Sequence, residues 1–210
     1  MSVILFAVHL SDGAIAPPWL VGGFVGAALL LLLAAWRLTE EWIPRVGVLT
    51  AAFFIGSTIH IPLLGLPTSV HLILNGLVGV ILGRRAPLAI TVGLYLQYLL
   101  NNHGGLSTLG LNACIIGLPA VLAGQVFPVL RSIGVPPFAT GCLLGGGAAG
   151  AAVGLNFLVL LLGGEDDWET LARLVLLIHI PVVILEGLML GVVVRYLEKV
   201  KPEMLGRQTQ

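Results

Sequence analysis

Long stretches without any charged residue constrain the fold of this chain more than any other feature. Residues Pro18 to Trp36 form a 19-residue window without a charge, and three longer uncharged windows follow at 46–83, 86–130 and 132–164. About 20 consecutive apolar residues in a helix span the hydrocarbon core of a bilayer. A helix also satisfies its own backbone hydrogen bonds where no water is present. These windows therefore predict an all-α polytopic membrane protein.

Turn-forming residues divide the uncharged windows into about seven spans. A Pro/Gly-rich stretch at 62–67 breaks the second window, and a polar run at 101–108 breaks the third. The expected transmembrane helices, of which the third is short enough that it need not cross fully, lie at about 18–36, 46–61, 71–83, 86–100, 109–130, 138–162 and 171–196. We interpret the whole chain, 1–210, as one transmembrane domain, with a helical bundle at 18–198 and a basic tail at 199–210.

The composition excludes two broad classes of protein. Hydrophobic residues make up 58% of the chain and charged residues only 10%, whereas a soluble domain carries about 25% charged residues. Such a chain cannot cover a surface that faces water. Its 10 Lys and Arg residues are balanced by 10 Asp and Glu residues, so it lacks the basic excess of a nucleic-acid-binding protein. Its expected surroundings are a lipid bilayer.

The basic residues indicate how the chain is oriented in the membrane. In the predicted topology, nine of the ten lie on one side of the membrane, and only Arg173 lies on the other side, beside an acidic run at 165–169. Cytoplasmic loops carry an excess of Lys and Arg. We therefore expect the N-terminus and the acidic loop outside, and the C-terminus in the cytoplasm.

All five histidines fall on the outer side of this predicted topology. They lie before the first span, at the end of the second, at the start of the third, after the fourth, and early in the seventh, at positions His9, His60, His71, His103 and His179 respectively. Imidazole is the commonest protein ligand for borderline transition metals. An outward-facing metal site is one interpretation. The other is that single histidines form hydrogen bonds with helix ends and loops.

Four separated motifs stand out along the chain. They are Val-His-Leu-Ser-Asp-Gly with a following Pro-Pro-Trp, Gly-Leu-Pro-Thr-Ser-Val-His-Leu, a Gly-Gly loop after a histidine, and the last span, at 8–13 with 17–19, 65–72, 103–112 and 178–187 respectively. Together they resemble the motifs of the CbiM/NikM family, the membrane substrate-capture (S) components of cobalt and nickel energy-coupling-factor (ECF) ABC transporters. The resemblance extends from residue 8 to about 205.

The resemblance implies a metal site near the N-terminus. In the family the metal is held by the free terminal amine, the amide nitrogen and imidazole of the second residue, and a histidine of the Thr-Ser-x-His-Leu motif. The matching positions are Val8, His9 and His71, and 8–17 is the implied outer metal-binding segment. Four nitrogens in a plane suit Ni²⁺ and Cu²⁺ and, less strongly, Co²⁺.

Two departures from the family pattern leave alternatives open. Seven residues, Met1 to Ala7, precede Val8, so the amine of Val8 would be tied up in a peptide bond. Either this segment is a non-native or mis-assigned extension and the protein starts at Val8, which we prefer, or the extension is real. In the second case His60 or His103 supplies the missing donors. His103 itself stands where the family usually has Asp.

The resemblance implies an ECF-type importer subunit that captures Ni²⁺ or Co²⁺ outside and passes it across the inner membrane of a bacterial or archaeal cell. The metal is the transported substrate, and no cofactor is expected. The implied partners are a transmembrane T component, cytoplasmic ABC ATPase subunits and a small accessory membrane subunit. The chain has no phosphate-binding loop and no HExxH pattern, so we expect neither an ATPase nor a metalloenzyme.

A secondary metal-ion transporter or channel that acts without an ATPase is the alternative. Repeated acidic residues within several spans would favour it, but only Glu186 lies in the middle of a span. An ionisable residue at that depth is costly and therefore has a role. Glu186 either relays a proton or positions the last span through a polar contact, and we prefer the second interpretation.

Overall fold

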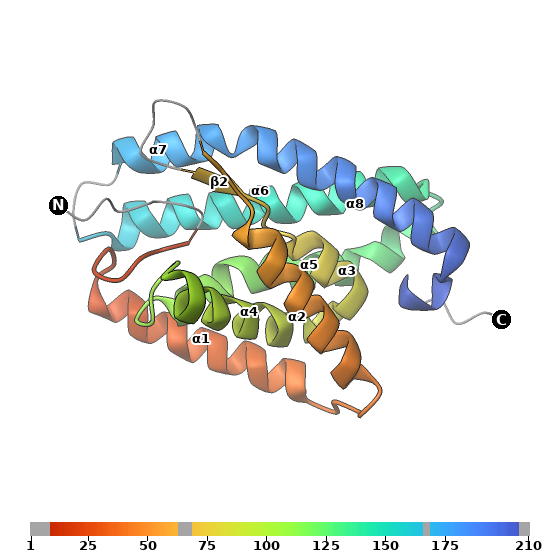
Figure 1. Ribbon diagram of the computed structural model, residues 1–210, viewed down its shortest axis with the longest axis horizontal. Coiled ribbons are helices and arrows are strands. Elements are labelled where there is room, and N and C mark those ends of the chain that lie inside the picture. The colour runs from red at the N-terminus through yellow and green to blue at the C-terminus, as the bar shows by residue number, and fades with distance from the viewer. Residues whose placement is uncertain (1–8, 63–68, 166–168, 206–210) are drawn as a thin grey trace.

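The computed structural model describes residues 9–62, 69–165 and 169–205 of the chain. Its elements, in chain order, are α1 (Pro17–Ala35), α2 (Trp42–Thr58), β1 (His60–Pro62), β2 (Ser69–His71), α3 (Asn75–Leu82), the 3₁₀ turn η1 (Gly83–Arg85), α4 (Ala86–Asn101), α5 (Leu109–Ser132), α6 (Pro137–Gly163), α7 (Glu169–Ile178), α8 (Ile180–Val200) and the 3₁₀ turn η2 (Pro202–Leu205). Most long helices run along the long axis of the molecule (Figure 1).

The helices have the length and apolar character of membrane spans. Five helical segments are long and apolar enough to cross a bilayer, and α2, with 17 residues, is a shorter apolar helix. Many large apolar side chains point outwards, as on α1, where Leu32 and Leu33 are 67% and 65% exposed. The chain is therefore an all-helical membrane protein with five to six candidate spans. The expected seventh would be α3, which at eight residues is about 12 Å long and cannot cross alone.

The segment Asn75–Asn101 is a helical hairpin. A straight 27-residue helix would hold its ends about 40 Å apart. Instead, the imidazoles of His71 and His103, which flank the segment, have centroids only 5.2 Å apart. The chain turns back in η1, where Gly83 has a φ of 55°, a conformation that glycine adopts readily. Helix α3 is buried in the middle of the bundle and α4 returns to the end from which α3 came.

One local prediction needs correction. The Pro/Gly-rich segment after α2 was expected to be a turn only, but it is flanked by a small antiparallel ladder in which His60 is paired with His71 and Pro62 with Ser69. The last span, expected at about 171–196, is confirmed as one candidate span at Ala172–Val200, with a local irregularity at His179 between α7 and α8. Pro181 explains the irregularity, because it lacks an N–H group and its ring crowds the carbonyl four residues earlier.

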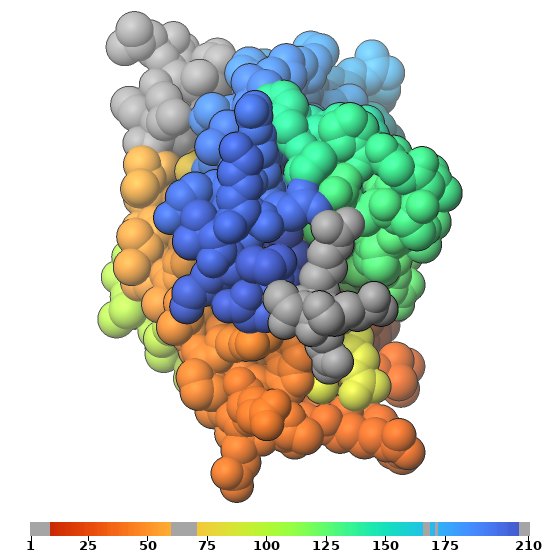
Figure 2. Space-filling model, turned by 90° about the vertical axis from the view of Figure 1, so that its right-hand side faces the viewer, coloured from red at the N-terminus to blue at the C-terminus, as the bar shows by residue number. Residues whose placement is uncertain are grey.

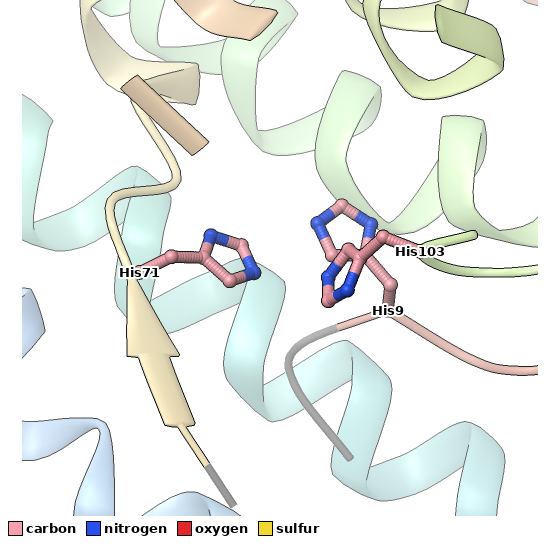
Figure 3. A group of neighbouring side chains, drawn as sticks. All are labelled: His9, His71 and His103. Carbon is pink, nitrogen blue, oxygen red and sulfur yellow. The ribbon is translucent and has the colours of Figure 1, made fainter. Parts of the chain in front are cut away.

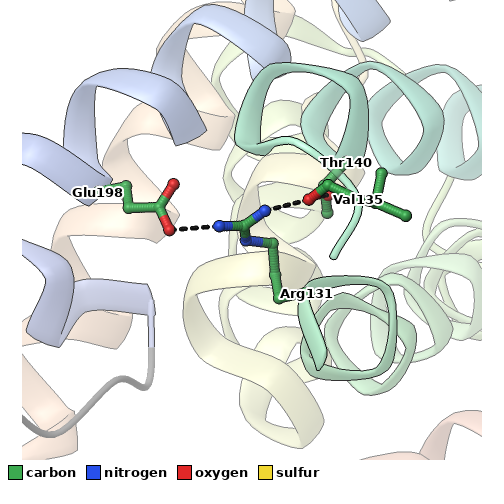
Figure 4. A network of polar contacts seen from close by, with 4 residues as sticks. All are labelled: Arg131, Val135, Thr140 and Glu198. Atoms are coloured by element: carbon green, nitrogen blue, oxygen red, sulfur yellow. Dashed lines mark hydrogen bonds and ion pairs between the residues drawn. The ribbon is translucent and has the colours of Figure 1, made fainter. Parts of the chain in front are cut away.

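Figure 2 looks onto the end of the bundle where α8 finishes. At this end, basic side chains connect the ends of several helices. The guanidinium of Arg131, at the end of α5, forms an ion pair with Glu198 of α8 at 2.5 Å and donates a hydrogen bond to the carbonyl of Val135 (Figure 4). Arg84 of η1 donates a hydrogen bond to the carbonyl of Trp36 at 2.8 Å. These contacts join η1 to the end of α1, and α5 to α8 and to the start of α6.

Candidate metal centre

Three of the five histidines meet at the opposite end of the bundle. The side chains of His9, His71 and His103 each offer a nitrogen atom, and these three nitrogens lie within 4.8 Å of one another. Figure 3 shows the ring of His71 pointing away from β2 towards the rings of His9 and His103. His9 and His71 are only 3% and 2% exposed, and His103 is half-buried. Residues 94 positions apart in the chain thus form one cluster of imidazoles.

His71 is oriented by its own backbone neighbour. Its Nδ1 lies 2.9 Å from the carbonyl oxygen of Leu72. A carbonyl oxygen only accepts, so Nδ1 carries the proton and donates it to this bond. The lone pair of His71 is then on Nε2, the nitrogen that remains to bind a metal. A hydrogen bond of this kind is the usual way in which a metal-binding imidazole is held in one tautomer.

Glu186 of α8 holds the segment that follows His71. Its Oε1 accepts hydrogen bonds from the backbone N–H groups of Ile73 and Leu74, at 2.5 and 2.9 Å. Leu74 has a φ of 54°, which is uncommon for a bulky residue and needs support from its surroundings. Glu186 itself is 1% exposed. The contacts agree with the preferred interpretation of Glu186, a polar contact that fixes the structure, and they place its effect next to His71.

Asn112 and Thr108, at the start of α5, hold the segment that carries His9. The side-chain oxygen of Asn112 accepts a hydrogen bond from the N–H of Leu10 at 2.9 Å, and its amide nitrogen donates to the Leu10 carbonyl at 3.0 Å. The hydroxyl of Thr108 donates to the same carbonyl at 2.7 Å. Three buried hydrogen bonds therefore fix the residue next to His9, so its imidazole is held at the start of α5.

Asp12 joins the His9 segment to the loop that carries His103. Its carboxylate accepts hydrogen bonds from the N–H of Leu106 at 3.3 Å and from the N–H and hydroxyl of Ser107 at 2.9 and 2.5 Å. Two glycines allow the close approach. Gly104 has a φ of 82°, and a Cβ atom on Gly105 would lie only 2.6 Å from the backbone nitrogen of Asp12. The Gly-Gly pair after His103 is therefore required by backbone conformation at one position and by space at the other.

Gly105→Ala tests this contact. The added methyl group would collide with the carboxylate and backbone of Asp12, so we expect the His103 loop to move away from His9. Loss of a contact that holds a metal ligand in place typically weakens metal binding by about 10- to 100-fold. We expect the metal affinity of Gly105→Ala, measured by chelator competition, to decrease within that range. Gly22→Ala on α1 is the matched control, because a Cβ atom there meets nothing within 4 Å. Equal affinities in the two variants would contradict the role of this contact.

The other candidate residues lie either outside the described part of the structure or away from the histidine cluster. Val8 lies outside the described residues, so its amine or amide stays a prediction. The backbone of His60 is directly opposite His71 in the β1–β2 ladder, but its side chain lies outside the described part. His179 is fully buried and is not part of the cluster. Its Nδ1 donates a hydrogen bond to the carbonyl of Val175 at 2.7 Å. Among the described residues, the metal-binding group consists of His9, His71 and His103.

Sequence reasoning missed the roles of Asp12, Thr108 and Gly105. Asp12 and the Gly-Gly pair both lie inside motifs that carried the family resemblance, and that was the available signal. Nothing in either motif alone shows that the two segments pair, because they are separated by almost half of the chain. Asn112 lies in the same motif as the Gly-Gly pair, and its side chain holds the His9 segment through its bonds to Leu10.

The arrangement suits a transition-metal ion. Three imidazoles with no carboxylate among them, largely removed from water, match the preferences of the borderline divalent cations rather than those of Ca²⁺ or Mg²⁺. Fold and site together define a class, a polytopic helical membrane protein with a histidine cluster for a transition metal at one end of its bundle.

Comparisons with known proteins identify the family. Residues 9–204 match the family model CbiM, described as "Cobalt uptake substrate-specific transmembrane region". The chain belongs to the CbiM family. It is therefore a multi-pass membrane component of metal transport, with relatives in bacteria and archaea, and not an enzyme.

Individual relatives agree with this assignment. A "Putative metal transport protein" of Haemophilus influenzae is 38% identical over 206 residues, which cover 95% of this chain and 98% of that one. A "Cobalt transport protein CbiM" of Geobacter sulfurreducens is 30% identical over 96% of this chain and 62% of its own length. A crystal structure of a transition metal transporter has the same fold, with a TM-score of 0.79, 21% identity, and coverage of 91% of this chain and 93% of that one.

One relative is a longer protein whose name describes it as fused. A "Putative fused cobalt transport protein CbiMQ" of Methanocorpusculum labreanum is 25% identical over 94% of this chain, but the match covers only 36% of that protein. The remainder of the fused chain is a further transporter component by its name. Association with partner components is therefore a property of this family.

Proposed function

We propose that this chain is the substrate-capture subunit of an ECF-type importer and binds Co²⁺ or Ni²⁺ at His9, His71 and His103 on the outer side of the membrane. The observation that carries the proposal is the convergence of these three imidazoles from separate segments, with two of them almost completely buried. Such a site removes the ion from water before it crosses the membrane. Because protons compete with the metal for imidazole nitrogens, capture weakens as the pH falls.

The distribution of charge supports an outward-facing site. Helix α5 begins beside the histidines, where Thr108 and Asn112 hold the His9 segment, and ends next to Arg131. Its 24 residues make it about 36 Å long. That length matches the roughly 30 Å hydrocarbon core of a bilayer. The contacts of Arg84 and Arg131 lie at the end away from the histidines. By the positive-inside rule that end faces the cytoplasm, and the histidines face outwards.

Seven passes follow from this orientation if the α3–η1–α4 hairpin is counted as two. Helix α3 enters from the outer end and turns back at Gly83–Arg85, and α4 returns outwards. The basic pair Arg84 and Arg85 is then at the cytoplasmic side. The short α3 is buried among the other helices, so its backbone does not have to satisfy the length requirement of a helix exposed to lipid.

The implied partners are a transmembrane T component, a pair of cytoplasmic ABC ATPases and a small accessory membrane subunit. The fused relative supports the first of these, because there a CbiM-like region and a further transporter component are one polypeptide. Energy for uptake would come from ATP hydrolysis on the partner chains.

Reconstitution tests the proposed function. In liposomes, the chain alone is expected to bind Co²⁺ at one ion per chain but not to accumulate it when ATP is added. Together with its T and ATPase partners it is expected to accumulate the ion with ATP, as measured with radioactive cobalt. Accumulation by the chain alone, driven by a proton gradient, would contradict the proposal and support a secondary transporter.

A further inference from the structure

Two arginines contact one tryptophan at the end of the bundle away from the histidines. The centre of the Trp42 ring, at the start of α2, lies 4.0 Å from the guanidinium carbon of Arg85 in η1 and 5.1 Å from that of Arg45 in α2. Both distances lie in the range of cation–π contacts. The two guanidinium carbons are therefore at most about 9 Å apart, so their positive charges repel each other. We call Trp42, Arg45 and Arg85 the arginine corner.

No acidic side chain neutralises the arginine corner in the described part of the chain. The ion pairs found there involve neither Arg45 nor Arg85, and Glu40 and Glu41, which precede α2, are exposed. The Nε atom of Arg85 is buried and has no hydrogen-bond partner among the described residues. An unsatisfied buried donor is costly, and more so on a charged group. The corner therefore requires an acceptor that these residues do not supply.

Two helix N-termini add to the positive charge of the corner. Helix α2 begins at Trp42, and α4 begins directly after Arg85, which is its N-cap residue. Neither helix has an acidic residue in its first turn or a capping hydrogen bond from a side chain. The N-terminal end of a helix favours anions, and an arginine there is unfavourable. Sequences break such local rules mainly at functional sites.

The surroundings of the corner are apolar. Trp36, whose carbonyl accepts the hydrogen bond from Arg84, is 64% exposed, and Ile43 and Val48 of α2 are 58% and 66% exposed. In Figure 2 the end of α1 and the start of α2 (orange) lie at the lower edge of the bundle. Tryptophan is enriched at the level of the lipid headgroups. An acidic segment of a partner protein would need a polar rim around its binding site, whereas a lipid fits an apolar one.

We propose that the arginine corner binds the phosphate group of an anionic phospholipid. A guanidinium that stacks on an aromatic ring uses its flat face and keeps its N–H edge for the oxygens of a phosphate. Basic clusters at the membrane surface on the cytoplasmic side bind anionic headgroups in this way. The acyl chains would lie against the exposed apolar side chains of α1 and α2. The assignment to the cytoplasmic leaflet rests on the proposed function and its orientation, but the binding itself does not.

The test measures lipid binding by the full chain in detergent with native mass spectrometry. The probes are dioleoylphosphatidylglycerol, whose headgroup is anionic, and dioleoylphosphatidylcholine, whose phosphate is balanced by a positive charge. We expect one phosphatidylglycerol per chain, bound at least about tenfold more tightly than phosphatidylcholine. Soluble glycerol phosphate at the same concentration is expected not to displace it. Equal binding of the two lipids, or displacement by the soluble phosphate, would overturn the proposal.

The double variant Arg45→Gln/Arg85→Gln locates the binding. Each arginine near the membrane surface strengthens binding of an anionic lipid by about fivefold, so we expect about 25-fold weaker binding of phosphatidylglycerol. The matched control, Arg195→Gln/Lys199→Gln, removes two exposed positive charges from α8 at the same end of the bundle. It is expected to change the affinity by less than about threefold. Equal losses in the two double variants would show a general attraction of charge and overturn the site.

A variant that keeps the charge guards against misfolding. Arg85→Lys retains a cation near Trp42 but loses the planar fork, and it is expected to bind phosphatidylglycerol several-fold more weakly while its size-exclusion profile stays monodisperse. Wild-type lipid affinity in Arg85→Lys would contradict the role of the guanidinium. Unchanged lipid binding in Arg45→Gln/Arg85→Gln, with loss of assembly with the partner subunits, would assign the corner to a protein and overturn the proposal. Metal binding is expected to stay unchanged in every variant, so failure of the lipid site leaves metal capture intact.

Discussion

His71→Ala is expected to remove the bound metal from the protein, from one ion per chain to none that survives gel filtration. The substitution deletes one of three imidazoles and leaves two in a site that excludes most water, so the ion loses a ligand that water does not readily replace. Loss of support for a ligand already costs about 10- to 100-fold in affinity, and loss of the ligand itself costs more. His9→Ala is expected to behave in the same way, as measured by metal content with mass spectrometry.

The control for this prediction is another buried histidine. His179 is 0% exposed and bonded to Val175, so His179→Ala also removes a buried imidazole. It is expected to lower thermal stability but to retain one ion per chain. Size-exclusion profiles show whether each variant is folded. A monodisperse His71→Ala protein that keeps a full complement of metal would contradict the site.

Two substitutions of Glu186 are expected to have very different effects on metal affinity and thermal stability. Glu186→Gln keeps a side-chain oxygen that accepts the N–H groups of Ile73 and Leu74, so fold and metal affinity are expected to stay close to wild type. Glu186→Leu leaves both buried N–H groups without their acceptor, at a cost of about 1–3 kcal/mol each. The strained Leu74 and the adjacent His71 lose their support. We expect metal affinity to fall by at least about tenfold and Tm to fall by several degrees.

Calorimetry and chelator competition on the two variants provide the measurement. Glu186→Leu with wild-type Tm and affinity would show that these hydrogen bonds do not position His71. The transport assay distinguishes the proton-relay interpretation, because Gln accepts hydrogen bonds but does not carry an exchangeable acidic proton. If Glu186→Gln binds metal normally but stops ATP-driven uptake, the role of Glu186 is not structural alone.

The course of the chain through the membrane was largely predictable from charge. The uncharged windows located α1, α5 and α6 within a few residues, because a bilayer demands long apolar helices. The α3–α4 hairpin was also anticipated, since Arg84 and Arg85 interrupt the apolar pattern. The β1–β2 ladder was not anticipated, because two strands of three residues are too short to show the alternation of apolar and polar residues that indicates a strand. The local irregularity at His179, within the confirmed last span, follows from Pro181.

The candidate site was only partly predictable. The topology placed His9, His71 and His103 on one side of the membrane, but it placed His60 and His179 there too. Which histidines meet depends on contacts between distant segments, namely Asn112 and Thr108 with Leu10, Asp12 with Ser107, and Glu186 with Leu74. Such pairings arise from packing of the whole bundle and leave no periodicity in a single sequence. The family resemblance pointed to His9 and His71 and left His60 and His103 as alternatives, and the fold brings His103 to the first two.

Locating a bound ion tests the account most directly. Crystals of the full chain grown with Co²⁺ can be measured at the cobalt absorption edge, where anomalous scattering marks the ion without reference to the protein. The account predicts one strong peak per chain, about 2.0–2.1 Å from nitrogens of His9, His71 and His103. A fully occupied cobalt peak elsewhere in the protein, with these three imidazoles bound to nothing, would contradict it.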